Sequence, residues 1–242
     1  MIVLRSLLFL VLQALLTVFF ALAGMLAAPF SFQTRFRVIT GWNRSVIWLA
    51  RWICGIRWRV TGLENLPAGP AIIMSKHQSA WETIAMPVLM PPLTTVIKQE
   101  LLKIPFFGWG MSLLEPIALD RGAGRAALKH LEEQGRDRLA RGLWVLLFPE
   151  GTRVSPGETG KYNIGGAWLA TRTGTDVVPV AVNAGHVWGR NALLKHPGLV
   201  TVSIGPVIKT AGRKADAVNT EVQQWIEQEM QFLEQDDGKA RN

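Results

Sequence analysis

The chain has 242 residues, enough to bury one sizeable core, and we expect one compact body with a smaller appendage. Its single cysteine, Cys54, excludes an internal disulfide framework, and because no cluster of cysteine or histidine surrounds it we expect a buried hydrophobic residue and no metal site. The net charge of +8 does not indicate a nucleic-acid partner, because seven arginines and no acidic residue fall in residues 1–63, and the other 19 basic residues nearly balance the 18 acidic ones.

Residues 6–28 form an uncharged, strongly apolar stretch that ends at Pro29. At 1.5 Å per residue, a helix over this stretch is long enough to cross a bilayer core of about 30 Å. A cleaved signal peptide is the alternative, because Arg5 precedes the stretch and Ala-Leu-Ala at 21–23 resembles a cleavage site. The apolar run continues past that site into a basic flank, which favours a membrane anchor with the body on the cytoplasmic side.

Residues 34–58 carry a basic stripe and an aromatic stripe at helical spacing. Arg37, Arg44 and Arg51 recur at seven-residue steps, and Trp48 and Trp52 lie four residues apart. Arginine binds lipid phosphates while indole rings lie at headgroup depth, so the pattern predicts a second helix at the membrane surface. An ordinary amphipathic helix packed on the body is the alternative.

After residue 60, short β-branched runs alternate with longer helical patterns. This alternation predicts an α/β fold with a mixed, largely parallel sheet flanked by helices. Pro179 lies inside one of the runs, which indicates an edge strand or a bulge there. We expect strands at 56–62, 71–75, 94–98, 116–120, 143–148, 176–182 and 199–205, and helices at 79–90, 100–112, 123–141, 163–173 and 216–234.

Three polar motifs follow predicted strands: KHQSAWE after 71–75, DRGAGR after 116–120, and PEGTR after 143–148. In open α/β sheets, ligands bind beyond the carboxyl ends of the strands. We therefore expect the three motifs to share one cleft.

The first motif places His77 and Glu82 five positions apart. Side chains at this spacing point about 140° away from each other on one helix, so the two can meet only if His77 lies in the turn before the helix. With Ser79 as N-cap, Glu82 falls in the first turn and can reach back. Two interpretations stay open: a histidine base oriented by a carboxylate, or a capping box in which Glu82 accepts a hydrogen bond from the Ser79 backbone and does no chemistry.

The hexapeptide FPEGTR at 148–153 has the composition of an anion-binding loop. Gly151 lets a ligand approach the backbone, Thr152 offers a hydroxyl, and Arg153 suits a bidentate grip on phosphate or carboxylate. A surface turn is the alternative. No G-x-S-x-G motif is present, so an attacking hydroxyl would belong to a substrate.

Lys98 and Arg121 each end or follow a predicted strand and would add positive charge to the same cleft, unless they are solvated surface charges. The sequence GAGRAA at 122–127 also satisfies the G-x-G-x-x-A pattern of a dinucleotide-binding loop. That pattern lies midway in the chain, and the next strand ends farther downstream than the dinucleotide fingerprint requires, so it remains the weaker interpretation.

Taken in order, the motifs resemble those of the glycerolipid acyltransferase family over about residues 60–210. The resemblance rests on His77 with Glu82, on Arg121, on FPEGTR, and on the VPVAV run that contains Pro179. That family commonly has aspartate where this chain has Glu82, which leaves the geometry of the pair open. The resemblance implies membrane-anchoring helices at 1–58 and an acyltransferase domain at 59–242.

By position, the resemblance implies that His77 is the general base and Glu82 its orienting carboxylate. Amides near residues 78–80, at a helix start, are candidate donors to the oxyanion. The resemblance further implies that Glu150, Gly151, Thr152 and Arg153 line the acceptor site, that Arg121 helps to grip phosphate, and that Lys98 and Lys103 face anionic substrate near an apolar acyl tunnel at 98–110.

The family transfers an acyl group from acyl-CoA or acyl-carrier protein to a lysophospholipid hydroxyl, which would supply the missing nucleophile. The resemblance thus implies acylation of the sn-2 hydroxyl of lysophosphatidate to phosphatidate, in phospholipid biosynthesis, on the cytoplasmic face of the inner membrane. Because the donor is already activated, we expect neither a metal nor another cofactor. The alternatives are another lysolipid acceptor, such as a lyso-ornithine lipid, and a noncatalytic lipid-binding module of the membrane.

Overall fold

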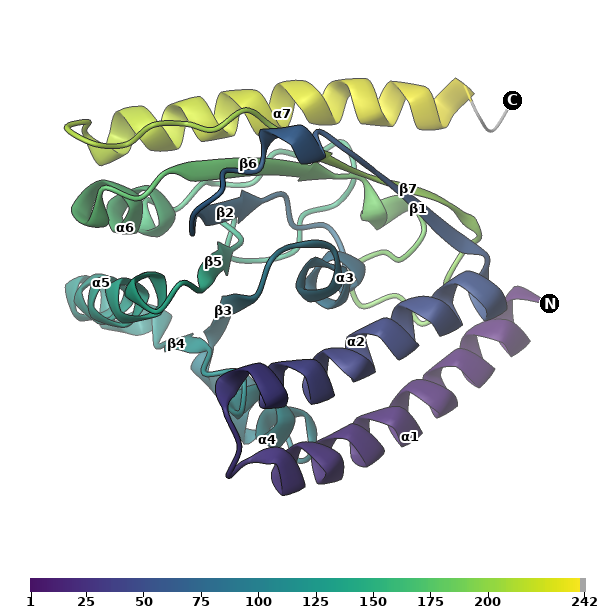
Figure 1. Cartoon of the computed structure of the whole chain (residues 1–242). Coiled ribbons are helices and arrows are strands. Elements are labelled where there is room, and N and C mark those ends of the chain that lie inside the picture. Colours follow the sequence, from purple (N-terminus) through teal and green to yellow (C-terminus); the bar gives the residue numbers. More distant parts are fainter. Residues whose placement is uncertain (240–242) are drawn as a thin grey trace.

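The structure, a computed structural model, describes residues 1–239, apart from the side chains of Arg121 and of residues 236–239. The described chain forms a seven-stranded sheet with helices on both faces (Figure 1). The strands are β1 (Ile56–Thr61), β2 (Ile72–Ser75), β3 (Leu93–Lys98), β4 (Ile117–Leu119), β5 (Trp144–Leu147), β6 (Val177–Val182) and β7 (Gly198–Ile204). The helices are α1 (Ile2–Ala27), α2 (Phe32–Cys54), α3 (Trp81–Leu89), α4 (Phe107–Ser112), α5 (Arg125–Ala140), α6 (Gly165–Thr173) and α7 (Ala215–Lys239).

The sheet is mixed and largely parallel, with the order β1-β7-β6-β2-β5-β3-β4. Strands β6 and β7 pair antiparallel, and every other neighbouring pair is parallel. The predicted fold class is therefore confirmed. The strands β2, β5, β3 and β4 run side by side in one direction, so the segments that follow them emerge at the same edge of the sheet.

All seven predicted strands form within about a residue of their expected ends, but one predicted helix does not. Residues 100–112 divide into a 3₁₀ turn over Gln99–Lys103 and the short helix α4. Pro105 lies between them, where it lacks the backbone N–H that a continuous helix needs.

Pro179 lies in β6, which is an inner strand with neighbours on both sides, so the predicted edge position is wrong. Val180 pairs with Ile204, and Val177 forms an isolated bridge with Ile208. Three residues of the β7 side therefore lie opposite two of β6, an irregularity of the bulge type. Proline is tolerated there because the regular ladder of β7 has already ended.

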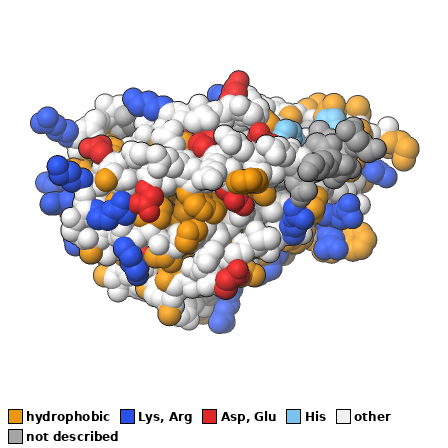
Figure 2. All heavy atoms as spheres, turned by 90° about the horizontal axis from the view of Figure 1, so that it is seen from above, with side chains coloured by type: hydrophobic (Ala, Val, Ile, Leu, Met, Phe, Trp, Pro, Cys, Tyr) orange, Lys and Arg blue, Asp and Glu red, His pale blue; other side chains and the backbone are white. Residues whose placement is uncertain are grey.

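Two hydrophobic layers hold the helices on the sheet. One lies between the sheet and α1, α2 and α3, and includes Phe9, Ile73 and the fully buried Trp81. The other lies under α5, α6 and α7, and includes Leu131 and Ile226. Helix α7 covers the face seen in Figure 2, where acidic side chains lie among basic and hydrophobic ones.

Helix α1 is long and apolar enough to cross a membrane, judged by its length and composition. Helix α2 buries one face, including Asn43 and Val46, against the body, and exposes Arg44, Trp48 and Trp52 on another. Both predicted properties of this segment thus occur together: it packs on the body and presents an aromatic and basic stripe outward.

Candidate active site

His77 lies in the turn after β2, and Glu82 lies in the first turn of α3. His77 Nδ1 and Glu82 Oε1 are 2.8 Å apart. The carboxylate is fully buried, while the imidazole keeps 14% of its surface exposed. The two side chains therefore meet in the way that the sequence requires, with histidine outside the helix. The contact uses Nδ1, so the other ring nitrogen, Nε2, is not part of the pair.

The helix begins one residue later than predicted, with Ala80 and not Ser79 as its N-cap, and the same glutamate oxygen bonds the turn before it. Glu82 Oε1 accepts from the amides of Gln78 and Ser79 at 2.8 and 2.6 Å, and the amide of Trp81 donates to Ser79 Oγ at 3.0 Å. The two interpretations of this motif are therefore compatible, because the capping contacts aim the carboxylate at His77. Two of the three amides predicted as oxyanion donors at 78–80 are already used by Glu82.

His77 faces a cavity of about 530 Å³ at the carboxyl edge of the sheet. Its ring stacks on Phe148, with centroids 4.0 Å apart and an interplanar angle of 20°. This stacking fixes the plane of the imidazole, and the bond to Glu82 fixes its rotation.

Four of the predicted binding residues line this cavity: Lys98, Gly151, Thr152 and Arg153. Arg190 lines it as well and donates to the Arg153 backbone oxygen at 3.2 Å. Among the described side chains, no carboxylate forms an ion pair with Lys98, Arg153 or Arg190. Three cations without acidic partners around one cavity favour an anionic ligand.

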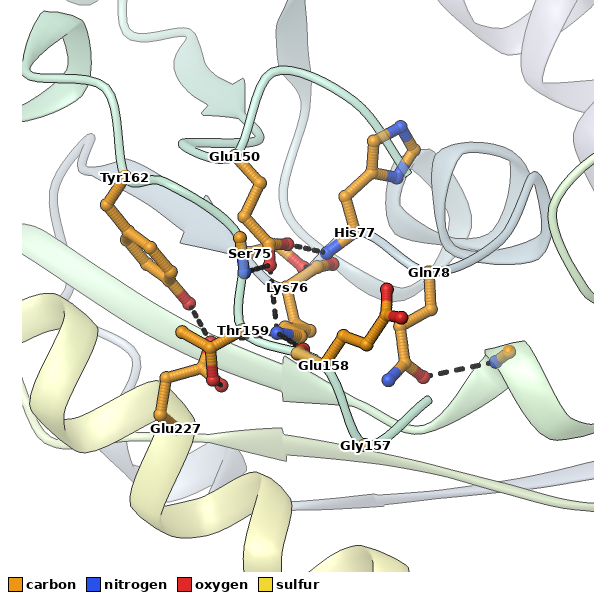
Figure 3. A network of polar contacts seen from close by, with 12 residues as sticks. Ser75, Lys76, His77, Gln78, Glu150, Gly157, Glu158, Thr159, Tyr162 and Glu227 are labelled. Atoms are coloured by element: carbon orange, nitrogen blue, oxygen red, sulfur yellow. Dashed lines mark hydrogen bonds and ion pairs between the residues drawn. The ribbon is translucent and has the colours of Figure 1, made fainter. Parts of the chain in front are cut away.

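Glu150 does not reach the cavity with its neighbours. Its fully buried carboxylate accepts from Lys76 Nζ at 2.8 Å and from the His77 amide at 2.9 Å (Figure 3). Burial raises the pKa of this carboxyl, and the hydrogen bond from Lys76 opposes the rise. The structure therefore places Glu150 behind His77 and not among the residues that line the cavity.

Two other predicted residues are not assigned to the cavity wall, for different reasons. Arg121 begins a 3₁₀ turn directly after β4, but its side chain is outside the described part of the chain, so its predicted role stays a prediction. Lys103 is exposed and lines neither this cavity nor the one below. No group of three acidic, histidine or cysteine side chains in the described residues could hold a metal ion.

A second cavity of about 310 Å³, mostly apolar, lies among α1, α2, α3 and α4. Its walls include Phe20, Ile39 and Phe107. Thr83, Thr95 and Arg153 line both cavities, so the apolar cavity borders the one that His77 faces. Part of the predicted tunnel stretch at 98–110 thus forms an apolar wall, together with the two N-terminal helices.

Comparison with known proteins places the chain in a family. The acyltransferase family model matches residues 57–183, which include the His–Glu pair and every residue of FPEGTR. This chain belongs to the acyltransferase family. The weaker dinucleotide-binding interpretation of GAGRAA is therefore set aside, and in the structure the second glycine of that sequence, Gly124, lines the cavity at the start of α5.

Individual relatives with acyltransferase names agree with this family assignment. The chain is 44% identical to the 1-acyl-sn-glycerol-3-phosphate acyltransferase of Pseudomonas aeruginosa over 93% of its own length and 90% of that protein. It is 30% identical to the protein of the same name from Borreliella burgdorferi, over 68% of this chain and 67% of that one. A solved structure of a 1-acyl-sn-glycerophosphate acyltransferase from Thermotoga maritima superposes with a TM-score of 0.81 over 96% of both chains, at 21% identity.

The sequence did not predict three residues of the site: Lys76, Arg190 and Glu227. Glu227 lies on α7 and accepts a hydrogen bond from Lys76. A signal existed for Lys76, since a lysine that directly follows a buried apolar strand needs an acidic partner. Arg190 and Glu227 lie in segments without a motif. Only the fold brings Arg190 to the cavity and Glu227 to Lys76.

Proposed function

We propose that the protein transfers an acyl group from a thioester donor, acyl-CoA or acyl-carrier protein, to the sn-2 hydroxyl of lysophosphatidate, giving phosphatidate. The observation that carries the proposal is one cavity that holds His77, oriented by a buried carboxylate, and that is also lined by three cations without an ion pair to any described carboxylate. Family membership and the names of the relatives support the reaction class and the acceptor.

In the proposed mechanism, His77 Nε2 takes the proton from the acceptor hydroxyl as its oxygen attacks the thioester carbonyl. A new ester bond forms, the carbon–sulfur bond breaks, and the thiolate leaves and takes up a proton. Glu82 holds the tautomer with Nδ1 protonated and stabilises the imidazolium that forms. Positioned base catalysis of this kind contributes roughly 10²–10⁴-fold to the rate.

The three cations occupy different positions in the cavity walls, which suggests different binding roles. Arg153 lines both cavities, so it can bind the acceptor phosphate while an acyl chain extends into the apolar cavity. Lys98 and Arg190 line only the cavity that His77 faces, and they suit further phosphate groups of either substrate. We assign Glu150 no direct contact with the acceptor.

The N-terminal part fits a membrane-bound substrate. We propose that residues 1–58 anchor the protein to the inner membrane and that the catalytic domain, 59–242, faces the cytoplasm. The exposed apolar surface of α1 and the exposed Trp48 and Trp52 of α2 support this arrangement. An acyl chain in the apolar cavity would then lie beside the helices that meet the lipid.

The test is release of free thiol by the purified full chain, with acyl-CoA and acyl-carrier protein as donors and a panel of lysolipid acceptors. Lysophosphatidate is expected to give the highest kcat/KM, and His77→Ala is expected to abolish turnover while lysophosphatidate binding persists. A higher kcat/KM with a lyso-ornithine lipid or another lysophospholipid would show that this lipid, and not lysophosphatidate, is the preferred acceptor. Lipid binding without thiol release by the wild type would leave a noncatalytic lipid-binding module.

A further inference from the structure

Behind His77 lies a buried ionic cluster made by Lys76, Glu150 and Glu227 (Figure 3). Lys76 Nζ is 2.8 Å from a carboxylate oxygen of each glutamate and 3.1 Å from the Glu158 backbone oxygen. The lysine side chain is 1% exposed. Each of its three ammonium protons therefore has an acceptor, which a buried cation requires.

The cluster fixes the backbone of His77. Lys76 is the preceding residue, and Glu150 Oε2 accepts from the His77 amide at 2.9 Å. The His77 carbonyl in turn accepts from the Val154 amide at 2.8 Å. The peptide that carries the imidazole is thus bonded on both sides, while the ring itself bonds Glu82 and stacks on Phe148.

Helix α7 supplies the third member of the cluster and ties down a second loop. Besides Lys76, Glu227 accepts from the Tyr162 hydroxyl at 2.7 Å and from Thr159 Oγ1 at 2.8 Å. Tyr162 and Thr159 belong to the segment that leaves the cavity after Arg153. One side chain of α7 therefore holds both the turn of His77 and the loop of FPEGTR.

A second glutamate repeats the arrangement one heptad later on the same face of α7. Glu234 Oε1 accepts from the Gly157 amide at 3.0 Å and from Gln78 Nε2 at 3.3 Å. Gln78 follows His77, and Gly157 lies in the loop after Arg153. The helix contacts both loops at two levels.

A cluster that served stability alone would not need these charges, since buried ion pairs are often replaceable by apolar residues at no cost. Here each charge sits on a different segment, and two of the segments carry the cavity's functional residues. Buried partners of this kind act on catalysis by holding reacting groups in place, where a displacement of about 1 Å can cost about 100-fold in rate.

We propose that α7 is a positioning element of the active site, in which Glu227, through Lys76 and Glu150, holds the peptide of His77 against the loop of FPEGTR. The helix lies beyond the residues that the family model covers, 57–183. None of the three cluster residues lines either cavity. The kinetic test of this inference rests on the proposed acyl transfer, because it measures kcat. The hydrogen-exchange test rests on the cluster geometry alone.

The test compares Glu227→Ala and Glu227→Gln with a matched control on the same helix. Glu229 is also a half-buried glutamate of α7, and its carboxylate accepts from Ser203 Oγ of β7 at 2.7 Å, away from both loops. Glu229→Ala therefore removes a half-buried, hydrogen-bonded carboxylate from the same helix without touching the cluster. Glu227→Gln keeps the volume and an accepting oxygen and removes the charge.

Glu227→Ala is expected to lower kcat roughly 10- to 100-fold, with a smaller change in KM, and Glu227→Gln to lie between it and the wild type. Glu229→Ala is expected to keep kcat within about twofold of wild type even if its melting temperature falls. Amide hydrogen exchange in the peptide around 75–79 is expected to speed up in both Glu227 variants and not in Glu229→Ala.

Wild-type kcat and unchanged exchange at 75–79 in the Glu227 variants would overturn the proposal, whatever their melting temperatures. If Glu227→Ala does not fold, Glu227→Gln decides by the same two measurements. Absence of acyl transfer in the wild type would overturn the proposed function alone, because the exchange measurement tests the coupling from α7 to His77 without substrate.

Discussion

Glutamine at position 82 separates the charge of Glu82 from its capping role. In the wild type, one oxygen, Oε1, accepts from His77 Nδ1 and from the amides of Gln78 and Ser79. The amide oxygen of glutamine can accept the same three bonds, so the turn and the tautomer of His77 are retained. The –NH₂ group then replaces Oε2, which is buried and already lacks a partner among the described atoms.

The loss in rate follows from the missing charge. When His77 takes the substrate proton, the imidazolium in the wild type lies against a buried carboxylate. Two unit charges about 4 Å apart at an effective dielectric constant near 20 interact by about 4 kcal/mol. Since about 1.4 kcal/mol corresponds to a factor of ten, we expect Glu82→Gln to lower kcat about 10³-fold.

Stability should change far less than rate. The capping bonds remain, and one unpartnered buried group replaces another, so we expect the free energy of unfolding to change by less than about 2 kcal/mol. Thiol release at saturating substrate gives kcat, and urea unfolding gives the stability. Ser79→Ala is the matched control, because it removes the bond to the Trp81 amide, costs about 1 kcal/mol, and leaves the pair intact.

A Glu82→Gln enzyme with near wild-type kcat would refute the charge argument and leave Glu82 as a cap. A Ser79→Ala enzyme that lost as much rate as Glu82→Gln would also contradict it, since the helix start and not the carboxylate charge would then limit catalysis.

Three further predictions follow from other parts of the molecule. Arg153→Ala is expected to raise KM for lysophosphatidate at least about tenfold with little change in kcat, because a charged hydrogen bond to phosphate contributes roughly 1.5–3 kcal/mol; steady-state kinetics measures both. The hydrogen bond from Arg141 lowers the pKa of the Glu115 carboxyl below its usual 4.5, so its charge stabilises the fold above pH 4.5 and this contribution is lost as the pH falls through the lower folded-state value. In urea unfolding, wild type should therefore exceed Glu115→Gln in stability at pH 6, begin to converge with it as the pH falls below about 4.5, and match it below the folded-state pKa. Leu8 and Leu15 are exposed side chains of α1. The double variant Leu8→Lys, Leu15→Lys is expected to bind vesicles at least about tenfold more weakly in a flotation assay, without a lower melting temperature.

Each of these has a clear contrary result. An unchanged KM in Arg153→Ala would remove Arg153 from the acceptor site, and Arg153→Lys, which keeps the charge but loses the planar fork, is its control. A stability difference between wild type and Glu115→Gln that stayed constant down to pH 3 would show that the ion pairs of Glu115 do not carry the effect. Full vesicle binding by the double-lysine variant would contradict membrane anchoring through α1.

The sequence by itself determined most of the fold. β-Branched runs, helical periodicity and glycine or proline breaks are local signals, so all seven strands could be found without the structure. The sequence also indicated which motifs would share a site, because segments that follow parallel strands emerge at one edge of a sheet. His77 and Glu82 could be paired for a similar reason, since the sequence predicted a helix start between them, although the N-cap is Ala80 and not the predicted Ser79.

Only the tertiary structure decided which way the side chains around that edge point. Glu150 shares a hexapeptide with Arg153, yet the turn directs its carboxylate into the protein, where Lys76 and the His77 amide satisfy it. The partner that completes this cluster, Glu227, comes 151 residues after Lys76. No local pattern encodes such a contact, because it depends on the packing of α7 across the sheet, and a buried charge is satisfied wherever the fold brings its partner.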